Sequence, residues 1–322
     1  MTASIHPAEW LRHIEKEYLT TFIRDGGFAI KFAVSTDDAP RSDVFDGLKT
    51  IGDRAGYAVV KIDAKVTKVH MVDEIFFRTA EQIPWSILSR KVIAKVAAES
   101  GYSWKESVDG PLYLDLAEAN QVDPQMLLLD LKKAIWNKVF KQRNLSKDFR
   151  VAMTHLCVAE LSGGQDGATT VKTLTEWLTG RNKAVSAVKP FQIFRKVNRA
   201  TARYFFESLV NWVRLAGYPG VVILLDAQRV MAARNPHDNG LFYSKAAVLD
   251  TYEALRQFID AADKLHGCFI TVATDIAFLE DNARGIGAYE ALKFRVFDEI
   301  RDKHLVNPMA SLARISATVR GM

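Results

Sequence analysis

Four short, mostly apolar runs set the strongest limit on how this 322-residue chain can fold. Each is bounded by glycine or polar residues, and they cover Phe28–Val34, Tyr57–Ile62, Val221–Leu225 and Cys268–Ala273. Apolar runs of this length with β-branched residues are typical of strands that are covered on both faces. A strand, a loop, a helix and a second strand follow one another between residues 28 and 62, which is the unit that builds parallel sheets. We therefore expect an α/β fold in which helices flank a parallel sheet.

Helical patterns account for most of the remaining chain. Apolar side chains recur at spacings of three and four residues, and we expect helices over Pro7–Arg24, Asp43–Ala55, Val72–Phe140, Val171–Leu215 apart from Pro190, and Ser244–Lys264. Loops are expected at Ser35–Ser42 and at the glycine-rich Ser162–Gly167. We expect residues 1–70 to hold the N-terminal helix and the first part of the core, residues 71–215 a mainly helical, basic insertion, and residues 216–322 the rest of the core.

The composition, with 48% hydrophobic and 25% charged residues, is that of a soluble globular protein and excludes a disordered chain or a disulfide-stapled mini-protein. The two cysteines, Cys157 and Cys268, are expected to be small buried residues in a reducing compartment. Residues 1–17 lack the apolar stretch of a secretion signal, and no run of about 18 apolar residues could span a membrane. We expect a cytoplasmic protein without membrane contact.

Positive charge gathers in one segment. The chain has a net charge of +5, but residues 132–214 carry 16 Lys/Arg and five Asp/Glu, a net +11 that leaves −6 on the rest. No acid interrupts the cations of residues 181–203, which are Arg181, Lys183, Lys189, Arg195, Lys196, Arg199 and Arg203. Phe191, Phe194 and Tyr204 are interleaved with them. This pattern predicts binding to a nucleic-acid backbone, although a solvated helix face or an acidic protein partner explains it as well.

A parallel sheet of this kind binds its ligand beyond the carboxyl ends of its strands. ATP hydrolysis requires there a glycine-rich loop ending in Lys-Ser/Thr and an apolar strand, called Walker B, that ends in an acid near Mg²⁺. Val221–Leu225 followed by Asp226 has the Walker B pattern, but the next residue is Ala227, which can do no proton chemistry. We identify no catalytic nucleophile with an adjacent base, and the histidines lack metal-ligand spacing.

The loop expected after the first strand, Ser35–Ser42, contains neither glycine nor lysine. Asp37 and Asp38 place negative charge where phosphates would bind, and Pro40 removes one amide donor. Arg41 and Ser42 keep a cation and a hydroxyl in the last two places, although arginine is bulkier than lysine. The same residues also suit an ordinary surface connection. The candidate residues of a degenerate nucleotide site are therefore Ser35, Arg41, Ser42, Asp226 and Thr274.

Four stretches in chain order carry a family resemblance, and they are Phe22–Val34, Asn198–Arg203 with Arg214–Asp226, Tyr252–Asp260, and Cys268–Leu279 with Asn307–Pro308. They resemble the BREX-associated ATP-binding family of AAA+ P-loop proteins, of the BrxC/BrxD type. The resemblance implies an AAA+-like P-loop fold with a helical insertion. The family pattern has a Gly-Ser-Gly-Lys-Thr loop where this chain has Asp38–Ser42, and an acid after the Walker B aspartate where it has Ala227.

These departures, set against the resemblance, imply a catalytically inactive pseudo-ATPase subunit of a bacterial anti-phage defence system. Such a subunit would bind double-stranded DNA or other defence proteins, for example an intact ATPase paralogue, a helicase or a nuclease, and could form an oligomer. No cofactor is expected, with ATP and Mg²⁺ left as a weaker expectation. Two alternatives remain open, which are an atypical ATP-binding or ATPase subunit of an AAA+ oligomer, and a purely protein-binding adaptor.

Other polar residues have simpler explanations beside their functional ones. Thr274 and Asp275 follow a buried strand where AAA+ proteins place a polar sensor for the terminal phosphate, but Asp275 also suits the N-cap of the next helix. Arg284 and Arg295 could act in trans on a neighbour's phosphate in an oligomer. His237 lies in a polar loop near the Walker B strand, and one functional interpretation is that this loop closes over the sheet edge.

Overall fold

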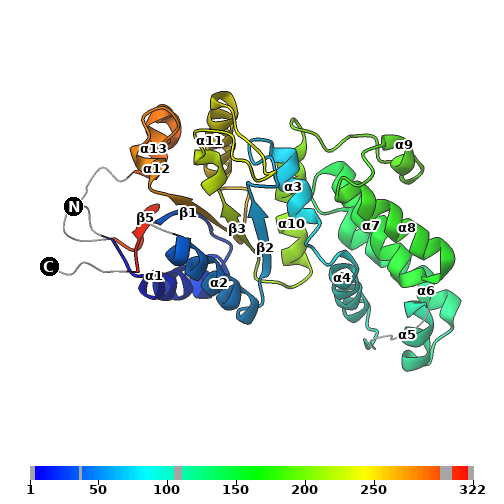
Figure 1. Ribbon diagram of the computed structural model, residues 1–322. Coiled ribbons are helices and arrows are strands. Elements are labelled where there is room, and N and C mark those ends of the chain that lie inside the picture. Colours follow the sequence, from blue (N-terminus) through cyan, green and yellow to red (C-terminus); the bar gives the residue numbers. More distant parts are fainter. Residues whose placement is uncertain (1–3, 36–37, 105–110, 298–306, 318–322) are drawn as a thin grey trace. The chain divides into compact units, whose positions relative to one another are not determined.

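The computed structural model describes residues 4–35, 38–104, 111–297 and 307–317 (Figure 1). The chain forms two compact units. The sheet unit comprises residues 1–79 and 218–322, and the helical unit comprises residues 80–217. We expected the insertion to run from residue 71 to 215, whereas the helix at residues 72–80 lies almost wholly in the sheet unit.

The sheet unit is built around five parallel strands in the order β2-β3-β4-β1-β5. The strands are β1 (Phe28–Ser35), β2 (Ala58–Asp63), β3 (Val221–Asp226), β4 (Cys268–Asp275) and β5 (Leu312–Ile315). Its helices are α1 (Pro7–His13), the π-helix η1 (Ile14–Phe22), α2 (Asp38–Arg54), α3 (Val72–Ala80), η4 (Gln228–Met231), α11 (Lys245–Asp260), α12 (Ala277–Glu280), η5 (Ile286–Ala288) and α13 (Glu290–Val296). The parallel sheet and its flanking helices confirm the α/β, P-loop-like fold.

The helical unit contains the helices α4 (Trp85–Glu99), α5 (Leu112–Asn120), α6 (Pro124–Ile135), η2 (Trp136–Phe140), α7 (Lys147–Ser162), α8 (Gly164–Leu178), α9 (Val185–Val188), η3 (Lys189–Phe191) and α10 (Ala202–Leu215). At its centre, α7 buries eleven of its 16 residues against neighbouring helices. Cys157 is among them, and Cys268 is equally buried in β4, as expected for structural cysteines.

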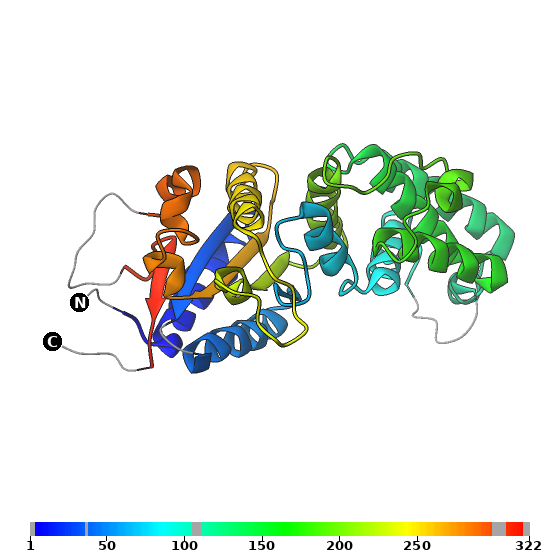
Figure 2. The same ribbon diagram turned by 45° about the horizontal axis from the view of Figure 1, so that its top comes forward.

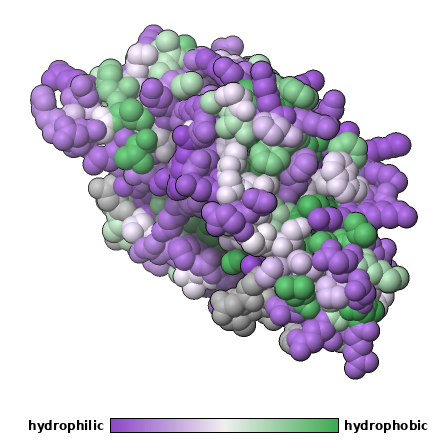
Figure 3. All heavy atoms as spheres, turned by 90° about the vertical axis from the view of Figure 1, so that its right-hand side faces the viewer, coloured by the Kyte–Doolittle hydropathy of each residue, from purple (hydrophilic) through white to green (hydrophobic). Residues whose placement is uncertain are grey.

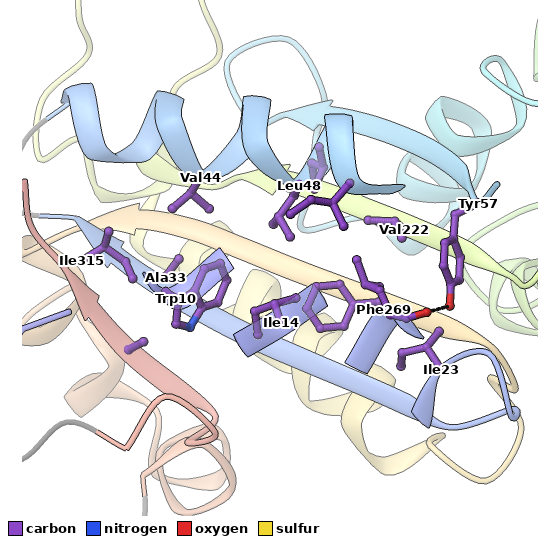
Figure 4. Packing of buried hydrophobic residues seen from close by; sticks show 14 of the residues in the cluster. Trp10, Ile14, Ile23, Ala33, Val44, Leu48, Tyr57, Val222, Phe269 and Ile315 are labelled. Carbon is purple, nitrogen blue, oxygen red and sulfur yellow. Dashed lines mark hydrogen bonds between the residues drawn. The ribbon is translucent and has the colours of Figure 1, made fainter. Parts of the chain in front are cut away.

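Helices cover both faces of the sheet, with α1 and α2 on one side and α11 and α13 on the other (Figures 1 and 2). On the first side, Trp10 and Ile14 pack with Val44 and Leu48 against Ala33, Val222 and Phe269, all of them fully buried (Figure 4). Neighbouring side chains of a strand point to opposite faces, so Phe32 instead stacks on Phe278, with ring centroids 5.6 Å apart. Burial of each large apolar side chain contributes about 1.5–3 kcal/mol to the stability of the folded state.

Several segment boundaries differ from those expected. Helix α2 already begins at Asp38, so Asp38–Ser42 form its first turn and not part of a loop. Pro40 is accommodated there because the first amides of a helix have no partner within it. Likewise, Gly163 ends α7 and Gly164 begins α8, so the expected loop at residues 162–167 is mostly helical. Residues 192–201, expected to be helical, consist of turns, a bend and backbone without regular secondary structure.

The short strand β5 was not expected from the sequence, which indicated only a short end after Pro308. It pairs with β1 from Phe32 to Ser35, and an isolated bridge joins its last residue, Ile315, to Ile5. Within the ranges that the structure describes, none of the helices is both long and apolar enough to cross a membrane.

Candidate functional site

A cavity of about 410 Å³ opens where the strands of the sheet unit end. The last residues of β2 and β3, Asp63 and Asp226, are paired with each other in the sheet register, and Asp275 is the last residue of β4. The cavity is lined by Arg41, Asp63, Lys65, Asp226, Gln228, Arg229, Met231, Ala232, Asp238 and Asp275. The cavity lies at the edge where parallel sheets bind ligands, and the cavity volume is within the usual range for a small-molecule site.

Arg41 and Asp226, which the sequence singled out separately, meet in this cavity. The Nε atom of Arg41 lies 3.5 Å from Oδ2 of Asp226, and the two side chains are only 16% and 27% exposed. Arg41 reaches Asp226 because it lies in the first turn of α2, directly after β1 and two strands away from β3 in the sheet. The acid with the Walker B position therefore has an arginine as its neighbour.

The backbone after β3 is held by the same carboxylate. Oδ1 of Asp226 accepts a hydrogen bond from the backbone amide of Gln228 at 3.1 Å. Ala227 between them is buried, with 6% of its surface exposed, and its amide donates to the carbonyl of Ala273. A methyl group therefore occupies the position from which an acid would orient water.

The three hydroxyl-bearing candidates divide into two kinds. Ser35 and Thr274 are each 1% exposed, at the ends of β1 and β4, and their hydroxyl oxygens have no hydrogen-bond partner among the described residues. Ser42 is exposed, and its hydroxyl donates to Asp46 at 3.3 Å on the same helix. Ser42 thus lies outside the cavity lining, whereas Thr36 and Asp37 of the expected phosphate loop are outside the described residues.

Sequence reasoning missed the most highly connected group of the cavity, which comprises Lys65, Arg229 and Asp238. Both terminal nitrogens of Arg229 donate hydrogen bonds to the Asp238 carboxylate, at 2.7 and 3.1 Å, and the Lys65 ammonium nitrogen lies 3.1 Å from Oδ2 of the same carboxylate. The hydrogen bonds from Arg229 and Lys65 hold the pKa of Asp238 well below its usual range. The one sequence signal for this group was the position of Arg229, three residues after Asp226 at the end of the Walker B strand.

Comparison with known proteins identifies the family. The model of the family described as BREX system ATP-binding protein BrxC/D matches residues 116–318, which is more than half of the chain. The chain belongs to the BrxC/D family. The match includes β3, α11 and β4, but not β1 or the first turn of α2. No curated protein and no solved structure matches the chain.

BrxC/D proteins are described as ATP-binding proteins of the BREX system, so the cavity can be tested against a triphosphate. Its lining has three cations and four carboxylates, and all three cations are paired, Arg41 with Asp226 and the other two with Asp238. A triphosphate would require these cations for itself. Within the described residues, ATP would therefore have to displace these ion pairs, and no group of three or more His, Cys, Asp or Glu side chains that could hold a metal ion occurs.

The basic segment of this BrxC/D member lies in the helical unit, between α8 and the start of α10. Six of its cations are exposed and Arg203 is half-buried. The fold supplies acids that the segment lacks: Arg195 Nε lies 3.8 Å from Oδ2 of the buried Asp148 of α7, and Arg203 pairs with Glu207 at 3.5 Å. Oδ1 of Asp148 also accepts the amides of Phe194 and Arg195, at 3.0 and 3.2 Å.

Three cations of the segment, Arg181, Lys189 and Lys196, form no ion pair within the described parts of the chain. Exposed aromatic rings accompany the segment, since Phe194 is 64% and Tyr204 48% exposed. Figure 3 looks onto a face of the helical unit, where hydrophilic side chains project and hydrophobic patches lie among them. The segment therefore offers both positive charge and apolar surface.

Of the four remaining polar candidates, three make structural contacts. Arg284 is buried, and its guanidinium donates to the carbonyls of Val230 and Tyr243, so it cannot reach a neighbouring chain. Arg295 pairs with Asp260 at 2.6 Å. Asp275 accepts the amide of Ala277 at 3.0 Å, but Ile276 occupies the N-cap position of α12, so Asp275 forms a turn just before the helix and is not the N-cap expected. His237 is exposed and does not line the cavity.

Proposed function

We propose that this BrxC/D family member does not hydrolyse ATP and acts as a binding subunit of the BREX defence system. The observation that carries the proposal is the ion pair between Arg41 and Asp226. In an active P-loop enzyme, the acid at the end of this strand helps to hold Mg²⁺, and the lysine of the phosphate loop contacts the phosphates. Here the two groups neutralise each other, and arginine cannot replace lysine in a tight phosphate loop without rearrangement.

The chemistry after β3 supports the same conclusion. Orientation of an attacking water requires a side chain that can accept a hydrogen bond, and Ala227 has only a methyl group. Ser35 and Thr274 bring hydroxyl groups to the ends of β1 and β4, but hydroxyls alone do not neutralise the charge that develops on a transferred phosphoryl group.

The test is release of phosphate from ATP in the presence of Mg²⁺, measured for the wild-type chain, Asp226→Asn and the exposed control Asp263→Asn. All three should give the rate of the protein-free blank. Turnover by the wild type that Asp226→Asn abolishes and Asp263→Asn preserves would show an atypical ATPase and overturn the proposal. Calorimetric titration with ATP and Mg²⁺ then examines binding separately from turnover.

A second binding role, for double-stranded DNA, is favoured by the unpaired cations of the basic segment. Arg181, Lys189 and Lys196 are exposed, as is Phe194 of the same segment. Contacts with phosphates depend strongly on salt, because each one releases counterions and contributes about 0.9 to the slope of log K against log salt.

The experiment is a DNA titration at several salt concentrations with Arg181, Lys189 and Lys196 all changed to glutamate. The matched control changes Lys16, Lys245 and Lys264, which are exposed residues of the sheet unit, and alters the net charge equally. We expect the first variant to lose affinity and up to about three units of salt slope, and the control to lose little. Equal binding by all three proteins would refute DNA binding here and favour an acidic protein partner.

A further inference from the structure

The Asp238 carboxylate is surrounded by a complete set of anion-binding donors. Besides both terminal nitrogens of Arg229 and the Lys65 ammonium, the backbone amide of Gly240 donates to Oδ1 at 3.1 Å. A guanidinium fork, an ammonium and a backbone amide are the groups with which proteins bind phosphate oxygens. The chain's own carboxylate thus fills a place that a phosphate group would suit.

The Arg229 side chain and the Lys65 backbone are held by contacts that do not involve Asp238. The Arg229 side chain is only 10% exposed, and its Nε donates to the carbonyl of Leu241 at 2.5 Å. Leu241 in turn donates its amide to the carbonyl of Lys65 at 2.8 Å, while the Lys65 amide donates to Asp63 at 2.7 Å. These contacts tie the Arg229 side chain and the Lys65 backbone to the end of β2. The Arg229 guanidinium would therefore keep its place if Asp238 withdrew, and the Lys65 ammonium, on its flexible side chain, would stay within reach of the site.

Asp238 itself is carried by a more exposed segment. Residues 233–235 and 237–239 are exposed, and Asn239 has a left-handed backbone with φ of 58°. The segment lies between η4 and the Leu241 anchor, and Asp238 faces the 410 Å³ cavity together with both cations. Withdrawal of this one side chain would leave two cations facing a cavity large enough for a pyrophosphate group.

We propose that Arg229 and Lys65 form a phosphate-binding site that Asp238 occupies in the resting protein, and that a pyrophosphate or nucleotide phosphate displaces Asp238 from it. The apparent affinity for phosphate is the intrinsic affinity multiplied by the fraction of molecules in which Asp238 has withdrawn. Occupation of the site by Asp238 therefore lowers the apparent affinity. This site is separate from the phosphate loop after β1, and phosphate can bind to it whether or not the protein hydrolyses ATP. The ATPase assay and the binding assay below therefore succeed or fail independently.

Isothermal titration with pyrophosphate and with ADP, both without Mg²⁺, tests the proposal on the full chain. Asp238→Asn removes the competing charge while keeping a similar shape, and should bind pyrophosphate about tenfold tighter than the wild type, or more. Asp263→Asn makes the same chemical change at an exposed position and should behave as the wild type. Adding Arg229→Gln to Asp238→Asn should abolish the gain. Equal gains for both ligands indicate recognition of phosphate alone, and a larger gain for ADP indicates a nucleotide.

A second variant guards against a local effect of the asparagine. Asp238→Ser removes the carboxylate without introducing an amide and should also increase pyrophosphate affinity. A Cβ atom at Gly240 would lie 2.7 Å from Cγ of Lys65 and 2.9 Å from a terminal nitrogen of Arg229, so Gly240→Ala crowds the two cations and should give no such gain. If neither Asp238→Asn nor Asp238→Ser binds more tightly than the wild type, and thermal unfolding shows both to be folded, the proposal is wrong.

Discussion

The Nε atom of Arg41 lies 3.5 Å from Oδ2 of Asp226, so the first turn of α2 neutralises the acid at the end of β3. The two residues are 185 positions apart in the sequence, and the strand order brings them to one edge of the sheet. In the same cavity, Asp238 neutralises Lys65 and Arg229. Within the described residues, internal pairs thus satisfy the charges that a nucleotide would otherwise contact.

The Arg41–Asp226 pair should contribute measurably but modestly to stability. A double-mutant cycle with Arg41→Gln and Asp226→Asn should give a coupling energy of about 0.5–1 kcal/mol in urea unfolding, because both side chains retain some contact with water. The exposed Lys49–Asp53 pair on α2 is the control and should give less. A coupling energy of zero, unchanged by salt, would contradict a direct interaction.

Gly220 should tolerate no side chain. A Cβ atom there would lie 1.8 Å from the carbonyl oxygen of Gly267, a backbone atom that itself accepts the amide of Val221. Gly220→Ala should therefore lower the free energy of unfolding by about 2–5 kcal/mol. At Gly287 an added Cβ meets nothing within 4 Å, and Gly287→Ala should change stability by less than about 0.5 kcal/mol. Similar unfolding curves for the two variants would refute the steric argument.

Lys31 should stabilise the sheet unit although it is a charged residue in a buried strand. It is 4% exposed, and its ammonium donates to the carbonyls of Met309 and Ala310 at 2.5 and 3.0 Å and lies 4.4 Å from the ring centre of Tyr18. Lys31→Met leaves both carbonyls without this donor and should cost about 2 kcal/mol in chemical denaturation. Lys49→Met, at an exposed position, is the control. A variant as stable as the wild type would show that these contacts contribute nothing.

His155 should make stability depend on pH. It packs between Trp136 and Phe191, and burial lowers its pKa below the usual 6.5, partly offset by a hydrogen bond with the Phe191 backbone. Below pH 6.5 the unfolded chain therefore binds a proton more readily than the native protein, so the free energy of unfolding should fall as pH decreases. His155→Gln should flatten this slope below pH 6.5, and His237→Gln, at an exposed position, should not. Identical slopes for both variants and the wild type would exclude the effect.

Local sequence patterns predicted the central strands well. Strands β1 to β4 were expected within one or two residues of where they lie, because apolar runs bounded by glycine report burial on both faces. The start of α2 was placed too late, because Pro40 and the acidic residues before it also suit a loop. Strand β5 was missed because four residues carry no period of their own, and its pairing is supplied by β1.

The sequence by itself determined which residues can enter this site: it has Asp226 after an apolar strand, Ala227 after the acid, and neither glycine nor lysine between Ser35 and Ser42. Only the tertiary structure decided how their charges are used. It paired Arg41 with Asp226, gave Asp238 to Arg229 and Lys65, and brought Asp148 to a basic segment that contains no acid of its own. The reason is physical: residue identity fixes a charge, but the partner that compensates it is set by distance, and distance depends on the order in which strands and helices pack.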